Sequence, residues 1–84
     1  MNYLTNETRT NWIVRVTIKE DDLMPSCAWR LEGHTINEAI DQTTRDCLRD
    51  YPTAYEWELI EYTRAKRLTS FPAPTGENRL WHSV

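Results

Sequence analysis

Histidine and cysteine are the residue types in this chain that could hold a metal ion. The sequence has two of each: Cys27, His34, Cys47 and His82. Structural zinc sites of the Cys₂His₂ type usually take their ligands in pairs that lie roughly two to five residues apart. None of these four residues forms such a pair. We therefore expect no metal site and interpret the histidines as surface residues.

A cysteine nucleophile needs a lowered pKa and a neighbouring base. The sequence pattern places Cys27 on the inward face of a predicted strand and Cys47 on the inward face of a predicted helix. Buried thiols behave as small hydrophobic residues, so we interpret both as part of the core. A disulfide between them across the core is the alternative.

Acid–base and phosphate chemistry also lack their usual sequence signals. The chain holds 13 Asp and Glu residues, but none has the apolar flanks that would raise a single pKa. The two glycines, Gly33 and Gly76, are too far apart for a phosphate-binding loop. We therefore expect a protein that is not an enzyme and uses no cofactor.

Charge is distributed unevenly along the chain, although the net charge is only −3. Residues 20–61 hold eleven acidic residues and three arginines, whereas residues 1–19 and 62–84 are both net basic. A helix and a loop within the acidic segment would form an acidic protein-binding face. The residues of this face are Asp21, Asp22, Glu38, Asp41, Asp46 and Asp50.

An acidic surface attracts and steers a basic partner. We therefore expect a non-catalytic protein-binding module, an inhibitor or adaptor, whose partner is a nucleic-acid-binding protein with a basic surface. In its sharpest form, the acidic surface mimics a phosphate backbone, as in small inhibitors that phages and mobile elements encode. The alternative is that these charges only keep a small domain soluble.

Aromatic residues near the C-terminus supply a second candidate surface. Trp and Arg dominate the binding energy of many interfaces. The candidate tail anchors are Phe71, Arg79, Leu80 and Trp81. The alternative is that these side chains fold back and cover the edge of a sheet.

A basic stretch supports an alternative function, nucleic-acid binding. Arg64, Lys66 and Arg67 lie near aromatic residues, so they could contact phosphates while bases stack on the rings. Because the chain as a whole is acidic, nucleic acid is the less favoured partner. The interpretation that we prefer is that these cations form the solvated end of a strand or pair with Glu56 and Glu58.

Alternation of apolar and polar residues predicts two strands in the first half of the chain. In residues 12–19 every second side chain is apolar, and residues 27–32 alternate in the same way. A period of two with β-branched residues is typical of a strand. The acidic, proline-containing segment 20–25 would join the two strands as a hairpin.

A capping-box pattern marks the start of a helix. Thr35 is followed three residues later by Glu38, at the start of a segment with helical periodicity. The pattern predicts a helix over residues 36–50, which ends before Pro52. Residues 54–64 fit either a strand or a helix, and their aromatic and β-branched side chains favour a strand.

This order of elements predicts an α+β fold. A small antiparallel sheet of three or four strands would carry one helix packed on one face, in the order β-β-α-β plus a C-terminal tail. Opposite charges, at Arg15 and Lys19 on the first strand and at Glu56 and Glu58 on the third, favour an antiparallel sheet in which the first strand lies between the second and the third. The single domain would span residues 1–68, with a polar lead-in at 1–10. A proline-containing tail, docked or flexible, would follow at 69–84.

Location and self-association can also be predicted from the pattern. The chain has no apolar run long enough for a membrane helix and no secretory signal after Met1. We therefore expect a cytoplasmic protein with no membrane partner. An uncovered sheet edge could pair two copies into a homodimer.

Overall fold

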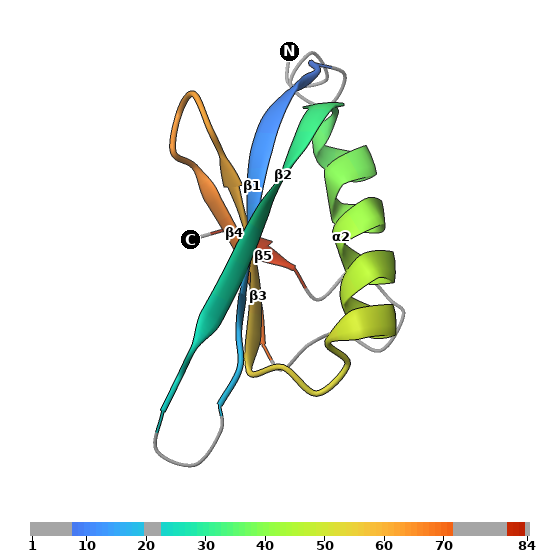
Figure 1. Ribbon diagram of the computed structural model, residues 1–84. Helices are drawn as coiled ribbons and strands as arrows, with labels where there is room; N and C mark the ends of the chain where they lie inside the picture. The colour runs from blue at the N-terminus through green and yellow to red at the C-terminus, as the bar shows by residue number, and fades with distance from the viewer. Residues whose placement is uncertain (1–7, 20–22, 72–80, 84) are drawn as a thin grey trace.

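The computed structural model describes residues 8–19, 23–71 and 81–83. These residues form β1 (Thr10–Thr17), β2 (Ser26–His34), α2 (Ile36–Asp50), β3 (Glu56–Glu61), β4 (Arg67–Ser70) and β5 (His82–Ser83) (Figure 1). The strands make one antiparallel sheet in the order β2-β1-β3-β4-β5. The α+β class is confirmed, and the first strand lies between the second and the third, as predicted. The sheet has five strands, where three or four were predicted.

Every second side chain of β1 contributes to the hydrophobic core. Trp12, Val14 and Val16 alternate along it and are all buried. On β3, Leu59 lies opposite Val14 and Trp57 opposite Val16, so these side chains share the same face. Trp57 and Leu59 are fully buried. Burial of apolar surface on this face is the main term that stabilises the sheet against α2.

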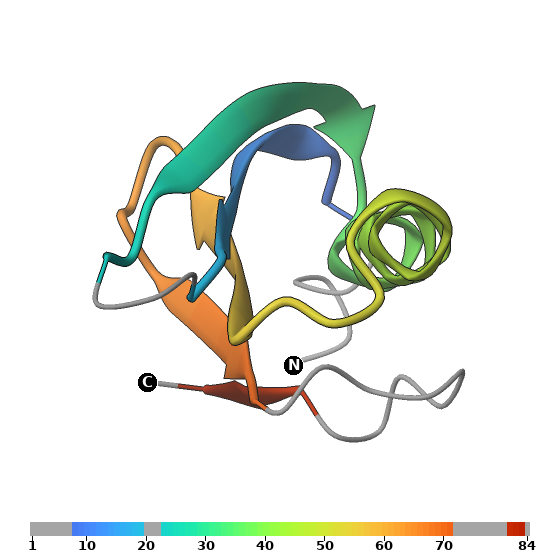
Figure 2. The same cartoon turned by 60° about the horizontal axis from the view of Figure 1, so that its bottom comes forward.

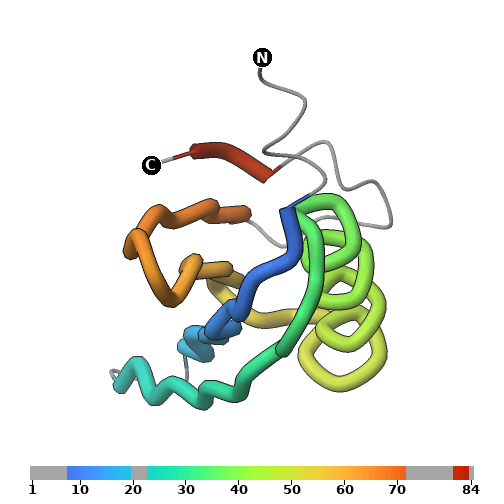
Figure 3. Tube along the Cα trace, turned by 90° about the horizontal axis from the view of Figure 1, so that it is seen from above, coloured from blue at the N-terminus to red at the C-terminus, as the bar shows by residue number. Residues whose placement is uncertain are grey.

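The helix α2 begins as the capping pattern predicts. The Glu38 backbone N–H donates to Thr35 Oγ1 at 3.2 Å, and the Thr35 N–H donates to Glu38 Oε1 at 3.1 Å. Ala39, Thr43 and Cys47 lie on the buried side of the helix. The sheet curves around the core and α2 lies along one side of it (Figures 2 and 3). Among the described residues, no helix combines the length and the apolar character needed to cross a membrane.

The ambiguous segment 54–64 is a strand followed by a turn. Just after β3, the Tyr62 N–H still donates to the carbonyl of Asn11 on β1 at 2.9 Å. The chain then reverses through Ala65, which adopts a left-handed φ of 57°. The strand that the aromatic and β-branched side chains favoured is therefore present as β3, and its Trp57 packs into the core.

The C-terminal part of the chain adds two strands to the sheet. The predicted boundary between domain and tail, at residue 68, falls inside β4. β5 pairs with β4, and just before it Trp81 donates from its indole nitrogen to Thr44 Oγ1 on α2 at 3.0 Å. Residues 81–83 are thus bound to both the sheet and the helix. β2 and β5 are the edge strands, and a homodimer formed at an edge stays a prediction.

Thr35→Ala is expected to lower the free energy of unfolding by about 1 kcal/mol, because it removes the acceptor for the Glu38 N–H. Urea denaturation followed by circular dichroism measures this change. Thr63→Ala, in the exposed turn after β3, is the control and should change the free energy by less than about 0.5 kcal/mol. Equal effects of the two substitutions would contradict the capping role of Thr35.

Candidate functional site

The acidic residues predicted on α2 are paired with cations of the same chain. Arg9 Nη1 lies 2.7 Å from Glu38 Oε1, at the start of the helix. Arg49 Nη2 lies 3.0 Å from Asp50 Oδ2 and 3.6 Å from Asp46 Oδ1, at its end. Arg49 belongs to α2 itself, whereas Arg9 comes from outside the helix and reduces the negative charge of its surface by one.

The pKa values of two of these carboxyl groups report the same pairing. The backbone N–H of Thr35, followed by the Arg9 guanidinium, holds the pKa of Glu38 below its ordinary value. The hydrogen bonds from Arg49 hold the pKa of Asp50 below its ordinary value. Both groups are therefore satisfied within the chain.

The remaining members of the predicted acidic face are not all placed. Asp41 is exposed on the middle turns of α2, whereas Asp21 and Asp22 lie outside the described residues. The described residues hold eight acidic and nine basic residues, so this part of the surface has no acidic excess. The surplus of negative charge in the chain belongs to residues outside the described ranges.

An ion-pair network lies on the sheet face that α2 does not cover. Glu58, 3% exposed, lies opposite Arg15 in the register of β1 and β3. Arg15 Nε donates to Glu58 Oε1 at 2.7 Å, and Arg67 Nη1 lies 3.4 Å from Glu58 Oε2. An ion pair between β1 and β3, of the kind that the sequence predicted, is therefore present at Arg15 and Glu58. Nearby, burial raises the pKa of Glu56, and the charge of Glu58 adds to the effect.

The basic stretch predicted for nucleic acid is largely occupied by carboxylates. Arg67 binds Glu58, and Arg64 binds Glu61 through Nε at 3.2 Å and Nη2 at 3.1 Å. Within the described ranges, no carboxylate pairs with Lys66. Two of the three cations are therefore held by the sheet, which favours the pairing alternative over phosphate contacts.

The structure separates the candidate tail anchors. Trp81 is half-buried, bonded to Thr44, and its ring centroid lies 6.3 Å from that of Trp57. It therefore covers the core, as the fold-back alternative has it. Phe71 is 52% exposed. Arg79 and Leu80 lie outside the described residues.

A cluster of exposed apolar side chains at one end of the sheet was not singled out from the sequence. It consists of Leu23, Met24, Tyr55 and Phe71, and we call it the hairpin end. They share this end because the start of β2, the start of β3 and the end of β4 all lie at the same end of an antiparallel sheet. The signal that could have found it is the Leu-Met pair in a hairpin connection, where polar residues are usual.

Backbone hydrogen bonds place the members of the hairpin end on both sides of β1. The Ile18 N–H donates to the carbonyl of Pro25, next to Met24, at 3.0 Å. On the other side, the Tyr55 N–H donates to the carbonyl of Thr17 at 2.8 Å. The rings of Tyr55 and Phe71 meet edge to face, with centroids 5.9 Å apart.

The two cysteines and the two histidines all lie within the described residues. Cys27 is half-buried and Cys47 fully buried, and both are free thiols, so the alternative disulfide is not formed. Burial, with the charge of Asp46, raises the pKa of Cys47 to about 12. His34 Nδ1 lies 2.8 Å from a backbone carbonyl oxygen of its own strand. Across the described ranges, no three His, Cys, Asp or Glu side chains could hold a metal ion together.

Comparisons with protein-family models, curated proteins and solved structures found no match to this chain. Its function therefore has to be inferred from its own surfaces and cavities.

Glu58→Gln is expected to lower the free energy of unfolding by about 2 kcal/mol, because a buried charged acceptor for two arginines is lost. Chemical denaturation at neutral pH measures the change. Glu32→Gln is the matched control, since Glu32 is exposed and lies 3.9 Å from Arg30. The control should change the free energy by less than about 0.5 kcal/mol. If Glu58→Gln were equally silent, the network would not stabilise the sheet.

Iodoacetamide at about pH 8 is expected to label Cys27 in the folded protein and to leave Cys47 unlabelled. The reagent reacts only with a thiolate that it can reach. Mass spectrometry of the digested protein locates the label. In denaturing urea both cysteines should react, which is the control for reagent and time. Equal labelling of the two in the folded protein would show that Cys47 is not buried as described.

Proposed function

We propose that this protein is a non-catalytic protein-binding module that docks a partner through the hairpin end. The observation that carries this proposal is the concentration of exposed apolar side chains there. Within the described part of the chain, five large hydrophobic side chains are exposed, and Tyr62 alone among them lies at the other end of the sheet. The other four are Leu23 (71%), Met24 (51%), Tyr55 (46%) and Phe71 (52%).

The chemistry of the hairpin end suits an interface. Clustered exposed apolar groups mark binding surfaces more often than single ones do. Aromatic residues and Met are enriched at the centres of protein–protein interfaces, where they fill pockets on the partner. Because the rings of Tyr55 and Phe71 already contact each other, little side-chain freedom remains to be lost on binding.

The charge next to the hairpin end indicates what the partner offers. In the sequence, Glu20, Asp21 and Asp22 join Lys19 to Leu23. An apolar pair directly attached to three carboxylates is complementary to an apolar cleft with a basic rim. Nucleic-acid-binding proteins carry basic surfaces, so they are the proposed class of partner, and this chain would act on them as an inhibitor or adaptor.

The hairpin end accounts for binding better than the acidic helix does. Arg9 and Arg49 already engage the carboxylates at the two ends of α2. The acids of the 20–22 segment are next to exposed apolar residues in the sequence, and we propose them as the groups that a basic partner contacts. The free thiols of Cys27 and Cys47 suit a reducing compartment such as the cytoplasm, which we propose as the site of action.

Replacing both Leu23 and Met24 by Ser is expected to abolish capture of the partner from a host lysate, because the apolar centre of the interface is lost. With the captured partner purified, the dissociation constant should rise by at least about tenfold. Tyr62→Ser is the matched control, since Tyr62 is 57% exposed at the other end of the sheet. It should capture the same partner with unchanged affinity.

Two further variants separate charge from apolar contact. Asp21→Asn with Asp22→Asn should weaken binding and reduce its dependence on salt, because rim charges steer association. Asp41→Lys, on the exposed side of α2, should leave binding unchanged. If Asp41→Lys abolished capture while the Leu23 and Met24 double variant retained it, the docking face would be the helix and not the hairpin end.

A further inference from the structure

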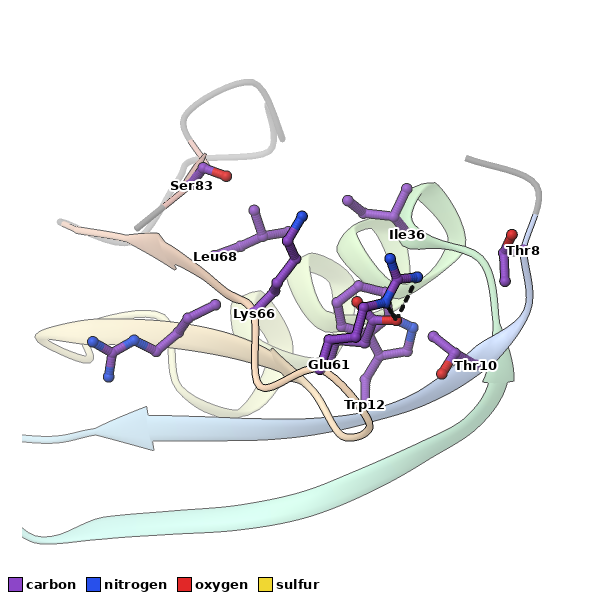
Figure 4. Close-up of a pocket in the computed structure, with 10 residues that line it drawn as sticks. Thr8, Thr10, Trp12, Ile36, Glu61, Lys66, Leu68 and Ser83 are labelled. Carbon is purple, nitrogen blue, oxygen red and sulfur yellow. Dashed lines mark hydrogen bonds and ion pairs between the residues drawn. The ribbon is translucent and has the colours of Figure 1, made fainter. Parts of the chain in front are cut away.

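We propose that a cavity beside Lys66 binds a small aromatic carboxylate. This cavity lies at the end of the sheet opposite the hairpin end, where β3 turns into β4 and α2 begins (Figure 4). It is therefore separate from the proposed docking surface, and neither proposal depends on the other.

The cavity has the size of a single aromatic ring. Its volume is about 130 Å³. An apolar cavity of about 150 Å³ holds benzene in a protein core, so a ring-sized ligand is the appropriate match. The apolar part of its lining comes from Trp12 on β1, Ile36 at the start of α2 and Leu68 on β4. An aromatic body would therefore contact three separate elements at once.

The largest wall of the cavity is held in place before any ligand arrives. The Trp12 indole N–H donates to the carbonyl of His34 at 3.0 Å, and Trp12 is almost completely buried. Ile36 follows the capping residue Thr35, so the helix start fixes its position. A preformed cavity avoids the entropy cost of ordering side chains on binding.

The charges around the cavity favour one negative group on the ligand. Glu61 is buried at the cavity, but Arg64 contacts its Oε2 through Nε and Nη2, so that pair is neutral. Arg67 also reaches the lining, but its guanidinium binds Glu58 on the other face of the sheet. In the described chain, Lys66 is the cation at this cavity that no carboxylate neutralises.

The position of Lys66 allows its ammonium to meet an anion while the ring of the ligand is buried. Figure 4 shows its side chain beside Leu68, with the ammonium on the side toward Ile36. Thr10 and Ser83 are also part of the lining. An apolar floor and one ammonium that no carboxylate of the described residues neutralises together match a ring that carries a single carboxylate.

Benzoate is the probe that tests this site. In nuclear magnetic resonance spectra of the ¹⁵N-labelled protein, benzoate should shift the assigned Trp12 indole signal saturably, with a dissociation constant on the order of 1 mM. The indole signals of Trp29 and Trp57 serve as internal references, since neither lines the cavity. Benzamide has the ring without the charge and acetate the charge without the ring. Each should bind at least about fivefold more weakly.

Two lysine variants provide the matched comparison, because the chain has only Lys19 and Lys66. Lys66→Met keeps most of the apolar stem and removes the charge, and should weaken benzoate binding by about fivefold. Lys19→Met, after β1 at the other end of the sheet, should leave it unchanged. Both lysines are exposed, so both variants should fold, which the indole spectrum itself reports.

Three results would overturn the proposal. The first is the absence of a saturable Trp12 shift up to about 10 mM benzoate. This concentration is about tenfold above the expected dissociation constant, so specific binding would be detected. The second is equal binding by Lys66→Met and Lys19→Met. The third is tighter binding of benzylammonium than of benzoate, which would mean that Glu61 and not Lys66 sets the preferred charge of the cavity.

Discussion

The pairing of β1 with β3 is the interaction on which the rest of this structure depends. On one face it brings Val14 and Val16 against Leu59 and Trp57, and all four side chains are buried. On the other face it places the Glu58 carboxylate between two arginines. A slip of one residue would turn Glu58 toward the core and Trp57 toward solvent, so both faces specify the same register.

With β1 between β2 and β3, the two ends of the sheet carry different kinds of side chains. The hairpin connection between β1 and β2 lies at one end, together with the start of β3 and the end of β4. Exposed apolar side chains collect there. The opposite end holds the β3–β4 turn and the first turn of α2, which line a cavity where Lys66 has no carboxylate partner among the described residues. The proposed docking surface and the proposed small-molecule site share no side chains.

Charge illustrates why position along a chain is a poor guide to a surface. The acidic middle of the sequence folds so that arginines from distant segments, Arg9 and Arg15, reach Glu38 and Glu58. Two cations of the basic stretch are also paired within the chain. Arg64 binds Glu61 and Arg67 binds Glu58. Carboxylates and guanidinium groups pair wherever the fold brings them within reach, because an unpaired charge near the core is costly. The net charge of a sequence segment therefore does not give the net charge of the molecular surface that the segment forms.

Local rules were enough to predict most of the elements of this protein. The alternation in β1, the capping box at Thr35 and the aromatic content around Trp57 each act within a few residues, and each predicted its element correctly. Opposite charges on the first and third strands also indicated their pairing, and Arg15 with Glu58 forms one of the expected ion pairs. The pattern left a fourth strand open, but the pairing of β4 and β5, the hairpin end and the cavity could not be predicted. They arise between segments far apart in the sequence, and only tertiary packing decides which side chains remain exposed and where space is left.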